Sequence, residues 1–380
     1  MSSWARIAVA AVLVAAAAAA VLMLSAADDA APGSDETGSE KVEGGLTAGA
    51  LAVTRTDRDT SPEIHVLPDG RQPVAATATA AHWCVLDNHG DAWCTGDGTD
   101  GRLGNGDRTS TSHLTPMSAP AGTSWAAIAA GPTSTCAIAD ADGTVWCAGA
   151  GSGGRLGTGD DRDRAVPTRV GGLEQARSVA VGASHACAVD GDGRLWCWGR
   201  GAHGKTGQDG GGQSVAPAPV ESSHTWDAVT VGTWHTCAIT TDGHIACFGW
   251  AEAGRLGTSR AATTAIPTPI DVPPVLFDHV AAGDAHTCAL DSDGAVWCWG
   301  ANDVGQTGVG QTGGSSTPQR VLEHAEALTV GSSHTCALIG GELWCWGLLP
   351  EGPAAAPTAT GLHADGAAAG AVHTVRWVAP

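Results

Sequence analysis

All twelve cysteines of this 380-residue chain fall into six pairs, and each pair occupies the same place in a unit of about fifty residues. The first cysteines of successive pairs are 52, 51, 50, 51 and 48 residues apart. Because a repeat of this length is typical of stacked or radially arranged supersecondary units, the period itself limits the possible folds. The pairs are Cys84 with Cys94, Cys136 with Cys147, Cys187 with Cys197, Cys237 with Cys247, Cys288 with Cys298, and Cys336 with Cys345.

The residues that flank each pair repeat with it. The shared pattern is Gly, two residues, His, one residue, Cys, a turn, and then Trp-Cys-Trp-Gly, most clearly over residues 182–199. Because several anchors recur in register, the cysteine spacing is not accidental. A Gly-x-x-Gly block and a proline complete the unit; they are Gly101 to Gly104, Gly154 to Gly157, Gly204 to Gly207, Gly254 to Gly257 and Gly305 to Gly308, with Pro116, Pro167, Pro217, Pro267, Pro318 and Pro357.

The segment between paired cysteines is typical of a β-hairpin, because alternating residues run into Asp or Asn and Gly and out again. Loop length and cysteine spacing vary together, which keeps the two cysteines opposite each other; the shortest loop is Gly340 and Gly341. A non-hydrogen-bonded pair of this kind has Cα atoms about 4.5 Å apart, within disulfide reach. We therefore predict six local disulfides, each of which removes up to roughly 3 kcal/mol of unfolded-state entropy.

Two metal-binding alternatives fit parts of this pattern. His and Cys on one strand with Cys opposite supply three zinc ligands, but no fourth ligand recurs and one unit has Ser134 in place of His. The turns at Asp190 and Asp192 and at Asp291 and Asp293 resemble calcium loops but lack a bidentate Glu at the required distance. We predict no metal and no cofactor, and we attribute these aspartates to turn formation.

The N-terminus predicts export. Arg6 precedes an apolar run over residues 7–24, followed by small residues and then acids. Residues 1–27 are predicted to be a signal peptide, and an uncleaved transmembrane anchor is the alternative because the run is just long enough to span a bilayer. Residues 28–45 predict a flexible acidic Gly/Ser linker, and residues 46–380 the folded domain. Either way we expect an extracytoplasmic location: secreted, periplasmic or on the cell surface.

The charge balance bears on partners. Arg6 is the only charged residue among the first 27, so the remainder has 18 basic and 39 acidic residues, a net charge of −21. Such a surface repels nucleic acid and anionic lipid. We therefore expect a protein partner, of basic character if charge steers it, and contact with a membrane only through residues 7–24.

Each unit accommodates four short strands. In the unit around Cys237 they are predicted at residues 227–231, 235–240, 244–249 and 267–272, with a long Gly-rich loop before the last. Four strands per unit, repeated radially, predict an all-β propeller. A solenoid is the competing architecture, but leucine repeats and helical patterning are absent from the sequence.

Gly-x-x-His-Thr-Cys-Ala-Leu at 283–290 and 331–338, with Asp-Gly-x-x-Trp-Cys-Trp-Gly at 293–300, resembles the repeat of the regulator of chromosome condensation family. The resemblance covers residues from about 74 to the C-terminus and implies a seven-bladed propeller with four-stranded blades. Only six full units are visible, so we predict that residues 46–67 supply outer strands to a seventh. The C-terminal tail would supply the rest, with Gly370, His373 and Thr374 in register and Val375 at the cysteine position.

Most aromatic and histidine residues belong to the repeat. Tryptophans beside the second cysteine are predicted to fill the space between blades, and the repeated histidines to make hydrogen bonds inside the blade rather than to serve catalysis. Outside the repeat, and therefore expected to lack a structural role, lie Trp83, Trp234, Trp250 and Trp377. Trp234 and Trp250 are predicted to share the face that carries the long loops, where they either bind a partner or cap the edge of their blade.

Three functions compete. We expect a non-enzymatic, monomeric, extracytoplasmic protein-binding scaffold; the resemblance adds that a secreted propeller of the family inhibits β-lactamases, and hence suggests an inhibitor of a secreted or periplasmic protein. Guanine nucleotide exchange on a small GTPase, also implied by the family, is disfavoured by the export signal and the acidity. An enzyme site in the central channel is the third, although no nucleophile with an orienting base is evident. Photoreception is unsupported. Residues 232–236 read Gly-Thr-Trp-His-Thr, whereas the photoreceptor motif of this family is Gly-Trp-Arg-His-Thr, so the Trp is displaced and the Arg is lacking.

Overall fold

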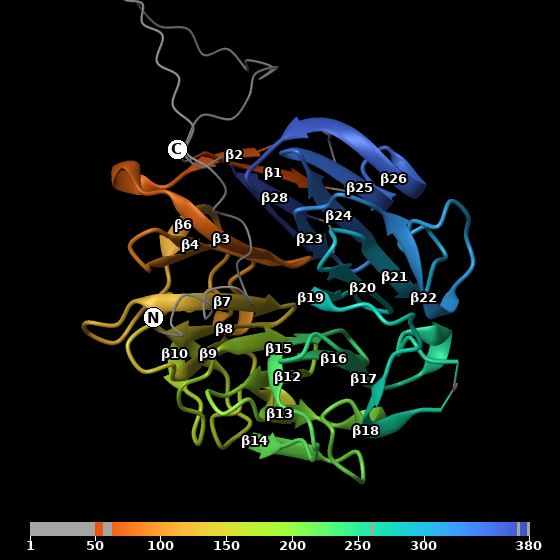
Figure 1. Ribbon diagram of the computed structural model, residues 1–380. Coiled ribbons are helices and arrows are strands. Elements are labelled where there is room, and N and C mark those ends of the chain that lie inside the picture. The colour runs from red at the N-terminus through yellow and green to blue at the C-terminus, as the bar shows by residue number, and fades with distance from the viewer. Residues whose placement is uncertain (1–49, 56–62, 260–261, 371–372, 378–380) are drawn as a thin grey trace, which may run out of the picture.

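The structure is a computed structural model that describes residues 50–55, 63–259, 262–370 and 373–377. Seven four-stranded antiparallel sheets surround a central channel, as Figure 1 shows. In each sheet one edge strand lines the channel and the opposite edge strand lies on the outside of the ring. The seven-bladed propeller is therefore confirmed. The predicted segments 1–27 and 28–45 lie outside the described residues.

We number the blades 1 to 7 along the ring, each from inner to outer strand. Blade 1 is β3 (Pro73–Ala78), β4 (His82–Asp87), β5 (Ala92–Gly96) and β6 (Thr111–Pro116). Blade 2 is β7 (Trp125–Gly131), β8 (Ser134–Ala139), β9 (Val145–Gly149) and β10 (Arg164–Arg169). Blade 3 is β11 (Ser178–Val181), β12 (His185–Val189), β13 (Leu195–Arg200) and β14 (Gln213–Pro219). Blade 4 is β15 (Trp226–Val231), β16 (His235–Thr240), β17 (Ile245–Gly249) and β18 (Thr264–Pro269).

Blade 5 is β19 (Phe277–Ala282), β20 (His286–Asp291), β21 (Val296–Gly300) and β22 (Ser315–Leu322). Blade 6 is β23 (Ala327–Val330), β24 (His334–Ile339), β25 (Glu342–Leu349) and β26 (Gly352–His363). Blade 7 is β27 (Gly366–Ala369), β28 (His373–Trp377), β1 (Ala50–Arg55) and β2 (Glu63–Val66). The helical turns are η2 (Pro68–Gly70), η3 (Thr99–Gly101), η4 (Ser152–Gly154), η5 (Ala202–Gly204) and η6 (Glu252–Gly254).

The paired cysteines form disulfides across the middle hairpin of blades 1 to 6. In blade 3 the register sets Cys187 opposite Cys197, three pairs from the turn when Val189 opposite Leu195 is counted first. The Cα atoms of every pair are 4.1 Å apart, close to the predicted spacing of a non-hydrogen-bonded pair. All six predicted pairings are confirmed, and none crosses between blades. Such bonds persist outside reducing compartments, so the fold is suited to a non-reducing environment.

Blade 7 closes the ring with strands from both ends of the described chain. β1 pairs with β28 in antiparallel register, Val53 lying opposite Val375, and β2 completes the outer edge. Val375 is fully buried at the position where the other blades have a disulfide cysteine. The prediction that N-terminal strands complete a seventh blade without a cysteine pair is confirmed.

The outer strands differ from the prediction. In blade 4 the fourth strand begins at Thr264, three residues before the expected start at Pro267. Proline therefore lies inside or at the end of the strand rather than at its start. Proline has no backbone N–H, and an outer strand tolerates it where that side of the strand faces solvent. Each outer strand of blades 1 to 6 also has a register shift against its neighbour.

The tryptophan after the second cysteine packs between blades, as predicted. Trp198 of blade 3 is fully buried in a cluster with Cys136, Cys147 and Leu156 of blade 2, and its Nε1 donates to the carbonyl of Arg155. Trp299 repeats both the packing and the hydrogen bond at the seam between blades 4 and 5, and Trp346 repeats the packing at the seam between blades 5 and 6. The disulfide of one blade thus contacts the indole of the following blade.

Two tryptophans outside the repeat also belong to the core. Trp83 and Trp377 are 4% and 7% exposed and lie in one cluster with Leu51, Val53 and Val375 at the seam between blades 7 and 1. The expectation that they lack a structural role is wrong, because the composite blade has no disulfide pair and large side chains fill its space. Among the described residues no helix is long and apolar enough to cross a membrane; the predicted anchor, residues 7–24, lies outside them.

Candidate functional site

The Gly-x-x-Gly blocks and the turn before the second strand of each blade gather at one side of the ring. We call this side the loop face; it carries η3, η4, η5 and η6, together with the residues that precede β8, β12, β16 and β20. Each block contacts the following blade, as where a Cβ on Gly204 would lie 2.8 Å from the backbone of Ala265. The loop face is therefore built from contacts between neighbouring blades.

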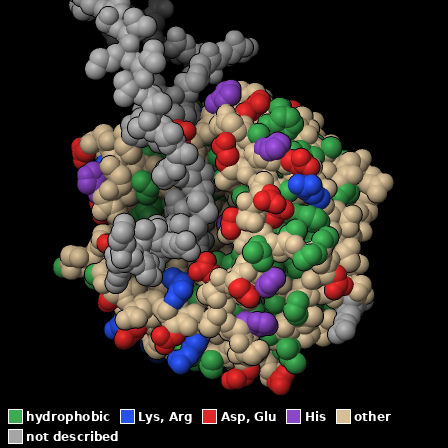
Figure 2. Space-filling view, in the orientation of Figure 1, with side chains coloured by type: hydrophobic (Ala, Val, Ile, Leu, Met, Phe, Trp, Pro, Cys, Tyr) green, Lys and Arg blue, Asp and Glu red, His purple; other side chains and the backbone are tan. Residues whose placement is uncertain are grey.

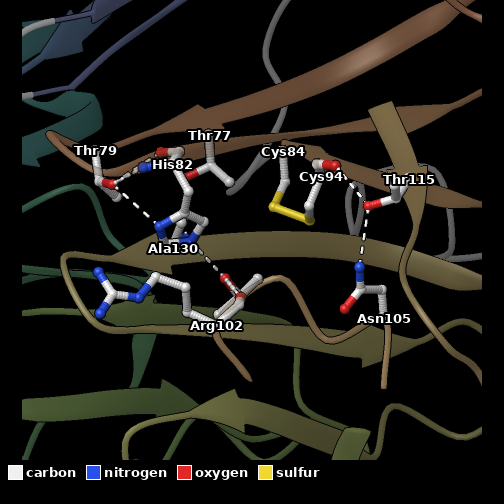
Figure 3. The surroundings of a disulfide bond; sticks show 10 residues. Thr77, Thr79, His82, Cys84, Cys94, Arg102, Asn105, Thr115 and Ala130 are labelled. Atoms are coloured by element: carbon white, nitrogen blue, oxygen red, sulfur yellow. Dashed lines mark hydrogen bonds between the residues drawn. A yellow bond between two sulfur atoms is a disulfide. The ribbon is translucent and has the colours of Figure 1, made fainter. Parts of the chain in front are cut away.

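The repeated histidines connect neighbouring blades by buried hydrogen bonds. His82 Nε2 lies 2.7 Å from Thr135 Oγ1 of blade 2, and His235 Nε2 lies 2.7 Å from Thr287 Oγ1 of blade 5. Figure 3 shows His82 beside Thr79 and the Cys84–Cys94 disulfide. Equivalent contacts join His185 to Thr236, His286 to Thr335 and His334 to Thr374. The histidines thus make hydrogen bonds as predicted, but these bonds cross to the following blade rather than staying inside one blade.

The threonine decides which nitrogen of the ring carries the proton. Thr236 Oγ1 donates to the carbonyl of Lys205 at 2.8 Å, so it accepts from Nε2–H of His185. Burial lowers the pKa of His185 well below its usual value, and lowers those of His235 and His286 to about 3. These rings are therefore neutral Nε2–H tautomers at physiological pH and hold no charge for catalysis.

One seam lacks both partners together. Where the other units have His, blade 2 has Ser134, and where the next unit would have the matching Thr, blade 3 has Ala186. Both residues are fully buried. At this seam the two partners are lost together, whereas at the closing seam the sequence has His373 in blade 7 and Trp83 at the threonine position of blade 1.

The glycine that opens each Gly-x-x-His motif allows the blades to approach closely. A Cβ on Gly232 would lie 2.5 Å from the carbonyl of Gly283, and one on Gly283 would lie 2.4 Å from that of Gly331. The same additions would meet the rings of His235 and His286. Only glycine fits such a contact, so these positions narrow the channel at the loop face.

The second position of the Gly-x-x-Gly block is a buried or half-buried cation in four blades: Arg102, Arg155, Lys205 and Arg255. Arg155 donates to the carbonyl of Ala183 and to Thr133 Oγ1, and Lys205 Nζ donates to Ser184 Oγ at 2.7 Å. Lys205 Nζ also donates to the carbonyl of Thr233, so these cations fasten the turns before the second strands of their own and the following blade.

Trp234 and Trp250, the predicted binding pair, lie in contact on the loop face. Their ring centroids are 5.4 Å apart in an edge-to-face arrangement. His203 of η5 completes the group: it stacks on Trp250 at 4.9 Å and meets Trp234 edge-on at 5.7 Å. Trp234 remains 37% exposed, and His203 is exposed. We call these three side chains the aromatic cluster.

Two cations lie against the aromatic cluster. Lys205 Nζ is 4.8 Å from the centroid of Trp234, and the guanidinium of Arg255 is 4.8 Å from that of Trp250. Burial, and secondly the charges of Arg155 and Arg200, lower the pKa of Lys205 to about 8. The cation–π contacts hold both indoles in place.

Sequence reasoning found the two tryptophans but missed His203, Lys205 and Arg255. A signal for the cations was available, because the second position of the block is basic in four units. His203 gave no such signal, since it belongs to blade 3 and contacts the two tryptophans of blade 4 only when the blades pack side by side.

The aspartate turns lie at the other end of the hairpins. Asp190 Oδ1 accepts from the backbone N–H groups of Asp192 and Arg194, and its Oδ2 accepts from Trp196 Nε1 at 2.8 Å. Asp291 repeats the arrangement with Trp297. The carboxylates are thus engaged in their own turns, as the turn interpretation predicts. Figure 2 shows acidic side chains spread over the face that it displays.

The central channel holds a cavity of about 290 Å³ lined mainly by Ala, Val and Thr of the seven inner strands. The titratable side chains among its lining residues are His279 and Glu326. Burial lowers the pKa of His279. The channel walls are thus mostly small and apolar, and the chemically diverse side chains lie on the loop face.

The seven-bladed ring, with its loops gathered on one face, places this chain among the β-propeller proteins. The model of the RCC1-like domain matches residues 37–352, and the chain belongs to this family. Human E3 ubiquitin-protein ligase HERC2 is 30% identical over 284 residues, which are 72% of this chain but 4% of HERC2. The Ultraviolet-B receptor UVR8 of Arabidopsis thaliana is 36% identical over 73 residues, 18% of this chain and 17% of UVR8. The chain therefore spans a small part of these relatives.

Solved structures show the same fold at low identity. Prp20p from Saccharomyces cerevisiae superposes with a TM-score of 0.75 at 19% identity, covering 87% of this chain and 92% of Prp20p. Human WBSCR16 has a TM-score of 0.76 at 19% identity, covering 87% of this chain and all of that one. These two similarities show that the propeller fold is shared.

Proposed function

We propose that the protein is a non-enzymatic, extracytoplasmic protein-binding propeller, and that its loop face binds the partner through Trp234 and Trp250. The observation that carries the proposal is the aromatic cluster. It combines a part-exposed indole with a second indole and an imidazole, all held by neighbouring blades. Preorganised tryptophans of this kind are typical anchors of protein interfaces.

The disulfides support the extracytoplasmic part of the proposal. Six buried pairs use all twelve cysteines, and the apolar run over residues 7–24 has the pattern predicted for an export signal. A cytoplasmic exchange factor would gain nothing from this covalent framework. Guanine nucleotide exchange on a small GTPase, which the family resemblance implies, is therefore the less favoured function.

The experiment is affinity capture from the extracytoplasmic fraction with the protein as bait. The wild type and the Ile266→Ala variant should recover the same partner, whereas the Trp234→Ala/Trp250→Ala variant should not. Ile266 is a matched control because it is a large apolar residue, 69% exposed, on the outer strand β18 of the same blade.

Thermal unfolding of all three proteins separates binding from folding. The double variant should keep a melting temperature within a few degrees of the control, because the cluster lies at the surface. Equal capture by the double variant would refute the role of the cluster. Recovery of cytoplasmic GTPases alone, with the protein itself in the cytosol, would refute the extracytoplasmic function.

A further inference from the structure

Next to the aromatic cluster the loop face carries basic side chains from two blades. Arg155 Nε donates to the carbonyl of Ser152 at 2.8 Å, while Arg200 Nη2 lies 3.4 Å from Ser152 Oγ. Arg155 and Lys205 then bind adjacent residues of one turn, Ala183 and Ser184. Arg155, Arg200 and Lys205 therefore form one basic patch that reaches Trp234 through Lys205.

Among the residues that the structure describes, Arg155, Arg200 and Lys205 form no ion pair with a carboxylate, although the charges of Asp100 and Asp163 act on Arg155. Elsewhere on the loop face, in the described part of the chain, Arg102 pairs with Asp97 and Arg164 pairs with Asp160. The charges that act on Lys205 are instead those of Arg155 and Arg200, and both disfavour its protonated form. In a chain with twice as many acidic as basic residues, a basic cluster of this kind is unexpected.

Local charge outweighs net charge at such a site. The screening length at physiological ionic strength is about 8 Å, so a bound segment senses the patch more strongly than the distant acidic surface. The net charge alone predicts a basic partner; the surroundings of the aromatic cluster favour the opposite sign for the segment that docks there.

We propose that the loop face between blades 2 and 4 recognises an acidic segment of a partner protein, with carboxylates at Arg155 and Arg200 and an apolar side chain on Trp234. This inference rests on the proposed function. Arg200 is exposed and has guanidinium donors available, so it can bind a carboxylate in bidentate geometry. Lys205 is only 2% exposed and supports Trp234 from below, which makes it a positioning residue.

The strand β13 offers a matched pair of charge-reversal variants. Arg200 ends the strand at the loop face, whereas Arg194 precedes its start in the opposite turn, beside Asp192. Both are exposed arginines of the same blade. Arg200→Glu and Arg194→Glu therefore change the net charge equally and differ only in the face that is altered.

Fluorescence anisotropy with a labelled hexaglutamate peptide tests the inference. We expect saturable, salt-sensitive binding that weakens about tenfold with Arg200→Glu and less than twofold with Arg194→Glu. Hexalysine should bind more weakly than hexaglutamate, and a single-stranded oligonucleotide of similar charge should not compete.

Each contrary result has a definite meaning. Absence of hexaglutamate binding up to ~1 mM, or equal loss with both arginine variants, overturns the acidic-segment inference. Competition by the oligonucleotide replaces it with general polyanion binding. If hexalysine binds instead and Trp234→Ala abolishes that binding, the inference fails while the aromatic cluster keeps its proposed function, which the capture experiment judges separately.

Discussion

The hydrogen bond between His235 and Thr287 provides a quantitative test of how the blades are held together. Both side chains are fully buried, so water cannot replace either partner. Thr287→Ala leaves the Nε2–H group of His235 without an acceptor, which should lower the free energy of unfolding by about 1–3 kcal/mol. In a His235→Ser variant there is no imidazole N–H that needs Thr287 as its acceptor. Thr287→Ala should therefore lower the free energy of unfolding by less in that variant.

The two substitutions therefore form a double-mutant cycle. We expect a coupling energy of about 1–2 kcal/mol, because the partners touch and share one bond. The weak second bond of Thr287, 3.4 Å to the carbonyl of Arg255, adds little to either arm. Ser134 and Ala186 show that this chain already contains a seam without either partner.

Guanidinium unfolding at pH 7.5, followed by tryptophan fluorescence with the disulfides intact, gives the four stabilities. Thr287→Ser serves as the control, since it keeps the hydroxyl and should lose under about 1 kcal/mol. A coupling energy below about 0.3 kcal/mol would show that the histidine and threonine are independent, and that their hydrogen bond does not hold blades 4 and 5 together.

Three further predictions concern the whole ring. Removing residues 46–73 deletes β1 and β2 and should lower the melting temperature sharply; an unchanged value would contradict closure by both ends. Replacing Cys288 and Cys298 by alanine should cost about 2–3 kcal/mol, whereas an unchanged denaturant midpoint would deny the disulfide its role. His235 and His286 have pKa values of about 3 in the fold and near 6.5 when unfolded, so the unfolded state binds more protons between these values. Stability should therefore fall on acidification, by about 2 kcal/mol per histidine from pH 7 to pH 5, and a flat profile would contradict their burial in neutral form.

The sequence predicted most of the ring because the repeat states the same local rules six times. Hairpin register follows from turn length, so Cys336 and Cys345 across Gly340 and Gly341 could be paired without a structure. Blade 7 was predictable from Val375 and its neighbours, which keep the repeat pattern without the cysteine. The outer strands were predicted less well, since edge strands tolerate proline and bulges that blur their limits.

The candidate site was only half predictable. Trp234 and Trp250 stood out because they exceed the repeat, and their positions at strand ends placed them on one face. His203 and Lys205 contact them from blade 3, and no spacing rule within one unit predicts such a contact. Trp83 and Trp377 stood out for the same reason but fill the closing seam, so excess over the repeat does not by itself separate binding from packing.

The Ser134 and Ala186 exception changes what counts as the exchangeable module of this propeller. At five seams the preceding blade supplies the histidine and the following blade the threonine, so a transplanted blade such as blade 4 imports half of two different contacts. Moving blade 3 behind a histidine-bearing blade would set Ala186 against an imidazole that needs an acceptor. Shuffling of repeats, in the laboratory or by gene duplication, should therefore succeed when the cut falls within a blade and each seam moves intact.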